Sequence, residues 1–379
     1  MKRFIVSILL FAVLAAAHSA WSADAGRRLW VGTYTDGTKS KGIYTALFDE
    51  QTGAVSALTV AAETPNPSFL ALHPNGKYLY AVNETGNGPE HSGLVTAYTI
   101  DAGTGTLTEL NHQLSRGAAP CHLAIDATGR FLVVANYGGG NFAEFAIGAD
   151  GRLSPSMALL AHAGSGPNKE RQEGPHAHDV VFSRDNRHLV AVDLGVDQVF
   201  VYTFDPASGA LKPAPQQSAA TPPGAGPRHF AFHPGGRSAF SINELSSTIT
   251  SYTWNGGTGA LTPGASVSTL PANFQGTNST AEIAIDAVGS FVYGSNRGHD
   301  SIAVFAVTPS GALSLVEHTP TGGKTPRNFT IDPTGRWLVA ANQDSSTLTV
   351  FRRDATSGRL TAAGTPHDAP TPVCVLFHP

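Results

Sequence analysis

The amino-acid sequence predicts an all-β fold: a seven-bladed β-propeller of four-stranded antiparallel blades, closed by pairing the C-terminal strand with the N-terminal strands of the mature chain. Three observations predict it. The 379 residues include 41 Gly and 25 Pro and only 14% charged residues, a composition typical of many short strands separated by turns. One strand-turn-strand pattern recurs along the whole chain. The chain also ends halfway through that pattern.

The first residues, "MKRFIVSILLFAVLAAAHSAWSADAG", predict a secretory signal peptide. Two cationic residues precede a mostly apolar stretch from Phe4 to Ala17, and small residues suited to a signal peptidase follow. The stretch is too short to span a bilayer comfortably, although an uncleaved anchor is the alternative. We expect residues 1–22 to be removed and residues 23–379 to form one propeller domain. The mature protein should then be periplasmic or secreted, without membrane attachment.

The repeated unit is an apolar strand, a four-residue turn and a second apolar strand. It is read as "PSFLALHPNGKYLYAVNE" from Pro67, "PCHLAIDATGRFLVVANY" from Pro120, "PRHFAFHPGGRSAFSINE" from Pro227 and "PRNFTIDPTGRWLVAANQ" from Pro326, with variants from His178 and Ala281. A third strand ending in an aromatic residue and a weaker fourth strand follow each pair. Four antiparallel strands with a period of roughly 50 residues indicate a propeller blade.

The two ends of the chain predict how the ring closes. The C-terminal "PVCVLFHP" matches the first strand of a repeat, and "AGRRLWVGTY" at residues 25–34 matches "TGRFLVVANY" at residues 128–137. We therefore expect the C-terminal strand to be the innermost strand of a blade whose other strands come from the start of the mature chain. Six complete repeats and this shared one give seven blades in a closed ring.

Charge and cysteine content restrict the classes of partner and the covalent structure. The formal net charge is −4 and no run of Lys or Arg supplies a basic face, which excludes a nucleic-acid partner. Cys121 and Cys374 fall in first strands of blades that are separated by another blade, too far apart for a disulfide. Both are expected to be buried core thiols. A monomer is favoured.

Polar residues at the strand ends should meet at one mouth of the central channel. In an antiparallel hairpin the start of the first strand lies beside the end of the second, and these are the inner strands of every blade. An Asn or Asp ends the second strand in six blades and is most simply a cap that bonds to the backbone. These residues are Asn83, Asn136, Asp193, Asn243, Asn296 and Asn342.

Neighbouring positions vary from blade to blade, as expected for a specialised surface. The mouth should collect Arg228, Arg297, Arg327, His122, His178, His229, Glu84, Glu244 and Glu282. Because a guanidinium binds carboxylate or phosphate bidentately, three arginines at one opening favour a small anionic ligand. The alternative is that the Arg and Glu residues only pair with each other as ties between blades.

Taken together, several segments resemble the seven-bladed lactonase family, which includes propeller-type 6-phosphogluconolactonases and fungal carboxy-cis,cis-muconate lactonizing enzymes. The segments are "GTYTDGTKSKGIY", "NPSFLALHPNGKYLYAVNE", "GPHAHDVVFSRDNRHLVAVDLG", "GPRHFAFHPGGRSAFSINELSSTITSY", "SNRGHDSIAVF" and "TPRNFTIDPTGRWLVAANQDS". The resemblance runs from about Leu29 to Pro379. It implies ester chemistry without metal or cofactor, with His178, Arg228, Glu244 and Arg297 as the catalytic groups. Further candidates, for substrate binding, are Glu282, Arg327, Gln343, His229, His176 and Glu84.

The reaction expected from this resemblance is hydrolysis of a sugar-type lactone to its aldonic acid. His178 or Glu244 would take a proton from the attacking water, while Arg228 and Arg297 stabilise the oxyanion and hold the anionic group. The chain has no nucleophile-elbow pattern in its glycine-rich segments "GHDSI" and "GGGNF". Because the signal peptide directs export, an unphosphorylated or otherwise carboxylated lactone is as admissible as a phosphorylated one.

Three alternatives remain open. The same groups could close a muconate to a lactone by cycloisomerisation. The propeller could instead bind an anion without catalysis, because propellers host many unrelated functions. A metal could also bind His176 and His178, which share one face at strand spacing, together with His122 or His229. The second shell that such a metal needs is not readable from sequence, and we expect no metal.

Overall fold

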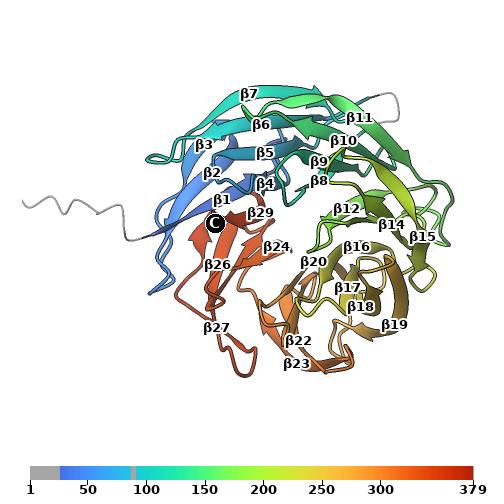
Figure 1. Ribbon diagram of the computed structural model, residues 1–379. Helices are drawn as coiled ribbons and strands as arrows, with labels where there is room; N and C mark the ends of the chain where they lie inside the picture. The colour runs from blue at the N-terminus through green and yellow to red at the C-terminus, as the bar shows by residue number, and fades with distance from the viewer. Residues whose placement is uncertain (1–25, 87–90, 379) are drawn as a thin grey trace, which may run out of the picture.

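The computed structural model describes residues 26–86 and 91–378 and confirms the seven-bladed all-β fold (Figure 1). Every strand of the described residues belongs to one of seven sheets arranged as a ring. The first strand of each blade lies nearest the central channel, and later strands lie progressively outward (Figure 1). Within the described residues no helix is long and apolar enough to cross a membrane. The predicted signal peptide, residues 1–22, lies outside these residues.

The first four blades hold their strands in the following order from the channel outward. The first blade holds β29 (Pro372–Phe377), β1 (Arg27–Thr33), β2 (Gly42–Phe48) and β3 (Thr59–Glu63); the second β4 (Leu70–Leu72), β5 (Tyr78–Asn83), β6 (Leu94–Ile100) and β7 (Leu107–Leu114); the third β8 (Pro120–Ile125), β9 (Phe131–Asn136), β10 (Asn141–Ile147) and β11 (Leu153–Ala161); the fourth β12 (Ala177–Phe182), β13 (His188–Asp193), β14 (Gln198–Phe204) and β15 (Leu211–Ala220).

The remaining blades continue in the same order. The fifth holds β16 (Pro227–Phe232), β17 (Ser238–Asn243), β18 (Thr248–Asn255) and β19 (Ala260–Ser268); the sixth β20 (Ser279–Ile285), β21 (Phe291–Arg297), β22 (Ser301–Val307) and β23 (Leu313–Pro320); the seventh β24 (Pro326–Ile331), β25 (Trp337–Asn342), β26 (Thr347–Arg353), β27 (Leu360–Ala362) and β28 (His367–Asp368). The fourth position of the seventh blade is divided, because β27 and β28 both pair with β26.

The ring closes as the sequence predicts. β29 pairs antiparallel with β1, with Leu29 opposite Phe377 and Val31 opposite Val375. Figure 1 shows this C-terminal strand beside the N-terminal strands of the first blade, so the two ends of the chain share one sheet. All four residues are buried in one apolar cluster that also includes strands of the seventh blade. Closure therefore ties the two ends of the chain through hydrogen bonds and core packing together.

Neighbouring blades bury both faces of every sheet. All six residues of β9 are buried, whereas the outermost strand of the same blade, β11, alternates with exposed positions. One apolar cluster joins Val133 and Phe142 of the third blade to Leu189 of the fourth. Burial on both faces explains why the inner strands read as nearly continuous apolar runs such as "FLVVAN" rather than as alternating patterns.

The turn between the first two strands of a blade requires a left-handed residue. Gly129, Gly236 and Gly335 adopt φ of 73°, 69° and 70°, a region that residues with a Cβ rarely enter. In the fourth blade Asn186 takes the same place with φ of 58°. Asparagine is among the few other residues that tolerate this conformation, which explains how the fourth blade keeps the turn without glycine.

The recurrent Asn or Asp has the structural role that the sequence suggests. Asn136 donates from Nδ2 to the carbonyl of Ser115 (2.8 Å), and Asp193 accepts from the backbone N–H of His176 (2.8 Å). Asn243 and Asn342 instead donate to threonine hydroxyls. All six are at most 1% exposed. These side chains are thus used to tie strand ends together and are not available to a ligand.

Both cysteines are free, as predicted. Cys374 packs in an apolar cluster between the first and second blades. Cys121 is buried too, as predicted, and its side chain in addition lines a cavity at the channel mouth. A register shift between Pro120 and His122 falls at this residue, and its Sγ lies 3.5 Å from the carbonyl oxygen of His178 in the next blade.

Candidate active site at the channel mouth

Bulges at the start of the first strands supply the functional side chains. The register between β16 and β17 shifts between Pro227 and His229, and equivalent shifts occur in the third, fourth, sixth and seventh blades. A bulge sets two residues of one strand against one of its partner, so two consecutive side chains can be directed toward the channel. Arg228 and His229 are such a pair, and both line a cavity at the mouth.

Glu244 is the centre of an ion-pair cluster at this mouth. It follows β17 and is 5% exposed. Its Oε2 lies 2.8 Å from a terminal nitrogen of Arg297 and 3.0 Å from Nε of Arg228, and its Oε1 lies 2.6 Å from Arg171. Burial alone would raise the pKa of Glu244, but the guanidiniums of Arg297, Arg228 and Arg171 outweigh it and lower the pKa to about 2. Glu244 is therefore an ionised anchor for three arginines.

Arg228 links this cluster to a second, deeper carboxyl group. Its NH1 donates to the carbonyl of Ala281 (2.9 Å) and lies 3.1 Å from Nε2 of His229. Because a guanidinium can only donate, Nε2 must accept, and the proton of a neutral His229 then resides on Nδ1. That Nδ1 lies 3.0 Å from Oε1 of Glu282. Burial, followed by the charge of Arg228, lowers the pKa of His229 well below its ordinary value and keeps the ring neutral.

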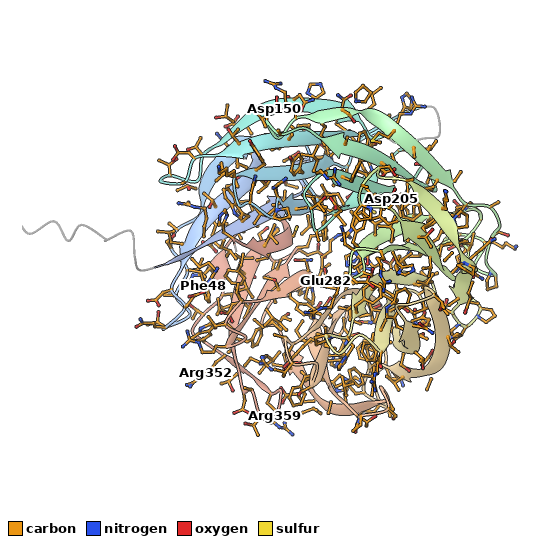
Figure 2. All side chains as sticks on the ribbon, viewed as in Figure 1. Phe48, Asp150, Asp205, Glu282, Arg352 and Arg359 are labelled. Atoms are coloured by element: carbon orange, nitrogen blue, oxygen red, sulfur yellow. The ribbon has the colours of Figure 1, made fainter. Side chains whose placement is uncertain are left out.

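Glu282 lies near the centre of the ring, whereas charged residues such as Asp150 and Arg359 lie at its periphery (Figure 2). Its carboxyl group also accepts from the backbone N–H of Ile283 (3.0 Å) and from the side-chain amide of Asn328. Burial raises the pKa of Glu282 to about 7, although Arg228 and these donors oppose the shift. Near neutral pH this carboxyl group therefore exchanges between its two protonation states.

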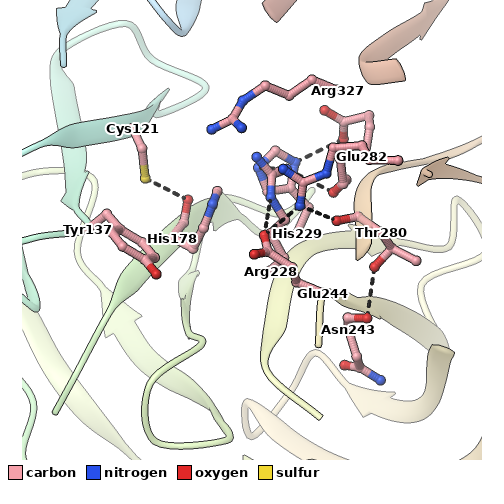
Figure 3. A network of polar contacts seen from close by, with 12 residues as sticks. Cys121, Tyr137, His178, Arg228, His229, Asn243, Glu244, Thr280, Glu282 and Arg327 are labelled. Atoms are coloured by element: carbon pink, nitrogen blue, oxygen red, sulfur yellow. Dashed lines mark hydrogen bonds and ion pairs between the residues drawn. The ribbon is translucent and has the colours of Figure 1, made fainter. Parts of the chain in front are cut away.

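His178 is a second buried imidazole at this mouth, beside His229. It is 4% exposed, and its Nδ1 is buried without a hydrogen-bond partner in the described part of the chain. Its ring centroid lies 5.2 Å from that of His229 and 5.7 Å from that of Tyr137 (Figure 3). Burial, followed by the charge of Arg228, lowers the pKa of His178 well below 6.5. At neutral pH this ring is therefore uncharged, and its unpaired Nδ1 is open to a ligand.

Arg327 lies on the other side of the Arg228 and His229 pair from Glu244 (Figure 3). It donates to the hydroxyl of Tyr34 (2.9 Å), and that hydroxyl donates to Oε2 of Glu84 (2.8 Å). The guanidinium also lies 5.2 Å from the centre of the Tyr34 ring. The arginines, histidines and glutamates expected at the mouth are thus brought together, in two groups on opposite sides of the channel.

Two expected substrate-binding residues make no direct hydrogen bond with the arginines or glutamates of these groups in the described residues. His176 stacks on Tyr137 at 4.5 Å and pairs with Glu173, so it reaches the cluster only through Tyr137, whose hydroxyl accepts from Arg171 (3.2 Å). Gln343 makes no side-chain hydrogen bond in the described residues, and its Oε1 is buried. Among the described residues no group of three or more His, Cys, Asp or Glu side chains is placed to hold a metal ion. His176 and His178 therefore have no third ligand of these types beside them there.

Arg171 and Tyr34 are residues of the site that sequence reasoning missed. Arg171 comes from the segment between β11 and β12, and Tyr34 follows β1. Neither occupies a position of the repeat that converges on the mouth. The only signal for Arg171 was the charged run "NKERQEG" inside a connection longer than those of other blades.

The fold and the site together define a class of protein: a closed seven-bladed propeller that gathers arginines around buried carboxyl groups at one mouth of its channel. The family model described as "Lactonase, 7-bladed beta-propeller" matches residues 28–377. The chain belongs to this lactonase family, which confirms the resemblance found in the sequence.

Relatives are similar over about three quarters of the chain's length or more. A 6-phosphogluconolactonase of Bacillus subtilis is 41% identical over 349 residues, which are 92% of this chain and 97% of the relative. A 6-phosphogluconolactonase of Formosa agariphila is 36% identical over 283 residues, 74% of this chain and 78% of the relative. The structure of the periplasmic gluconolactonase of Pseudomonas aeruginosa has a TM-score of 0.86 at 35% identity, covering 93% of this chain and 99% of that one.

Proposed function

We propose that the protein hydrolyses a sugar-type lactone to its aldonic acid at the channel mouth by general-base and electrostatic catalysis. The observation that carries the proposal is a pair of buried atoms without partners among the described residues, Nδ1 of His178 and Nε of Arg297. One is an acceptor on a neutral ring and the other a donor on a cation, and Arg228 influences both groups electrostatically. Buried polar atoms are nearly always paired, so these two suit a ligand that carries both a proton to release and a developing negative charge.

In the proposed mechanism His178 accepts a proton from water as that water attacks the lactone carbonyl carbon. Arg228 and Arg297 donate hydrogen bonds to the carbonyl oxygen, which becomes negative. When the ring C–O bond breaks, the imidazolium returns its proton to the leaving alkoxide, and the hydroxy acid is complete. A positioned base contributes about 10²–10⁴-fold, and a donor aimed at the oxyanion about 10²–10³-fold.

The sequence left open whether His178 or Glu244 accepts the proton from water, and the contacts of Glu244 favour a different role for it. Guanidiniums occupy both oxygens of its carboxylate, whereas Nδ1 of His178 has no partner among the described residues. The three ion pairs of Glu244 hold Arg171, Arg228 and Arg297 within reach of one oxygen-bearing ligand. We therefore assign the proton transfer to His178 and the positioning of the guanidiniums to Glu244.

The charge of the mouth supports an anionic substrate or product. Four guanidiniums at the mouth, those of Arg171, Arg228, Arg297 and Arg327, outnumber the carboxyl groups of Glu84, Glu244 and Glu282. Ties between blades would not need this excess, and an aldonic acid carries the carboxylate that it suits. The expected partner is a small anionic lactone or its acid.

We also propose that the protein acts outside the cytoplasm. The signal-like residues 1–22 support export, and so does the similarity to a protein named as a periplasmic gluconolactonase. An exported lactonase meets unphosphorylated lactones, so glucono-1,5-lactone is the first substrate to test.

Acid release from a panel of lactones, followed in a pH-stat with the purified mature protein, tests the proposal. We expect turnover of sugar lactones and a loss of about 10²–10⁴-fold in kcat for His178→Ala. His112→Ala, an exposed histidine of β7, is the matched control and should leave kcat unchanged. Full activity of both His178→Ala and Glu244→Gln would refute the mechanism. Turnover of muconates without lactone hydrolysis would instead favour cycloisomerisation, and binding without turnover a non-catalytic propeller.

A further inference from the structure

The side of the mouth opposite Glu244 forms a separate cavity. Its walls include Ser68, Glu84, Cys121 and Arg327, together with Arg228 at the boundary between the two sides. These residues come mainly from the blades next to the chain closure, whereas Glu244 and Arg297 come from the fifth and sixth blades. The enclosed space is about 10 Å³, room for about one water-sized group. The mechanism proposed above uses only Arg228 of this set.

The polar atoms of this cavity alternate between donors and acceptors. Ser68 is 5% exposed, and its Oγ is buried with no partner among the described residues. Glu84 accepts from Tyr34 at Oε2, and no described residue donates to its Oε1. Arg327 donates one hydrogen bond, to Tyr34, and keeps further N–H groups for a ligand. Because Tyr34 gives its proton to Glu84, its oxygen accepts from Arg327, and this bridge fixes both charged groups.

We propose that this cavity holds a terminal hydroxyl group of an unphosphorylated sugar lactone or acid, and that Glu84 disfavours a phosphate in its place. A hydroxyl group can donate to Oε1 of Glu84 while it accepts from Arg327 or Ser68. Arg228 and Arg327 would attract a phosphate dianion, but it has only acceptors and is larger than a hydroxyl group, so in this space it would face the Glu84 carboxylate without a proton to share. The arginines around Glu244 remain free for the carboxyl end of the same molecule. This inference rests on the proposed function and adds the substrate class to it.

The experiment is calorimetric binding of gluconate and 6-phosphogluconate to the full mature protein. We expect the wild type to bind gluconate more tightly, and Glu84→Gln to reduce the ratio of the two affinities at least tenfold by admitting the phosphate. Glutamine keeps the size of the side chain and an oxygen that accepts from Tyr34. The matched control is Glu63→Gln, an exposed glutamate paired with Lys41, which should leave the ratio unchanged.

A second variant tests the hydroxyl contacts separately. Ser68→Ala removes a buried hydroxyl that has no partner among the described residues, so it should weaken gluconate binding without a gain for 6-phosphogluconate. Tighter binding of 6-phosphogluconate by the wild type, or an unchanged ratio in Glu84→Gln, would overturn the inference. Hydrolysis of the two lactones is measured in parallel. Absence of turnover with the expected binding ratios refutes the proposed function alone, and turnover with unchanged ratios refutes this inference alone.

Discussion

Replacing Glu144 by glutamine should stabilise the folded protein at neutral and alkaline pH and leave its stability unchanged in acid. Glu144 lies in β10 and is 2% exposed. It stands opposite Val133 and on the same face as Phe142, toward the apolar cluster between the third and fourth blades. Its Oε1 is buried without a hydrogen-bond partner in the described residues. An ionised carboxylate there loses its hydration and gains nothing in return.

The size of the effect follows from the pKa of this group. Burial, followed by the charge of Asp126, raises the pKa of Glu144 from 4.5 to about 7. The fold therefore favours the protonated form, so its contribution to stability is complete below pH 4.5 and is lost as the pH rises through 7. A shift of about 2.5 units at about 1.36 kcal/mol each gives an upper limit of about 3.4 kcal/mol. Residual solvation reduces this to about 2 kcal/mol.

Urea unfolding followed by tryptophan fluorescence at pH 4 and pH 8 measures this difference. Glu144→Gln should raise the free energy of unfolding by about 2 kcal/mol at pH 8 and by nearly nothing at pH 4. Comparison with the wild type at each pH cancels the effects of other buried carboxyl groups such as Glu282 and Asp179, whose pKa values burial also raises. The exposed control Glu63→Gln should change neither value. Equal changes at both pH values, or a loss of stability at pH 8, would show that the reasoning is wrong.

Two further variants test the site and the closure. In Glu282→Gln the new amide N–H faces one of the donors from His229, Ile283 and Asn328. His229 is then held less firmly, and so is Arg228, which donates to it. We expect kcat/KM to fall about 10–100-fold. The wild-type decline below pH 7, where Glu282 takes up its proton, should disappear, and an unchanged pH profile would contradict this role. Deleting residues 372–379 removes β29 and its buried side chains, and each fully buried apolar side chain contributes about 1.5–3 kcal/mol to stability. The truncated chain should therefore lose its cooperative thermal transition. If it melts at the same temperature and as cooperatively as the full-length protein, closure is not important for stability.

The repeat and the closure could be predicted because they depend on local patterns. Strand length, turn glycines and apolar runs are visible in any short window, and the half repeat at the C-terminus specifies its own partner. The same reasoning places Arg228, Glu244 and Arg297 at one mouth, since equivalent positions of a ring repeat must lie at equivalent heights. The structure confirms the strand pairing that closes the ring, and ion pairs join these three residues in it.

Residues outside the repeat could not be placed in this way. Arg171 arrives on an irregular connection, and Tyr34 is set between Arg327 and Glu84 by the closing blade. The sequence predicted that Cys121 is buried but not that it lines the cavity, because the register shift at this position leaves little trace in the sequence. Such features depend on how one loop or one register shift packs against distant blades.

The sequence by itself determined the all-β ring, its seven blades, the paired ends of the chain and the ring of polar residues at one mouth, because each follows from periodicity and turn chemistry along the chain. Only the tertiary structure decided the charge state of those residues. Two glutamates only 38 positions apart differ by about 5 pKa units, about 2 for Glu244 and about 7 for Glu282, because three guanidiniums surround the first and burial dominates the second. Solvation and the distance to other charges are properties of the folded ring. They make Glu244 a permanently ionised partner of three arginines and Glu282 a group that titrates near neutral pH, although both are glutamates.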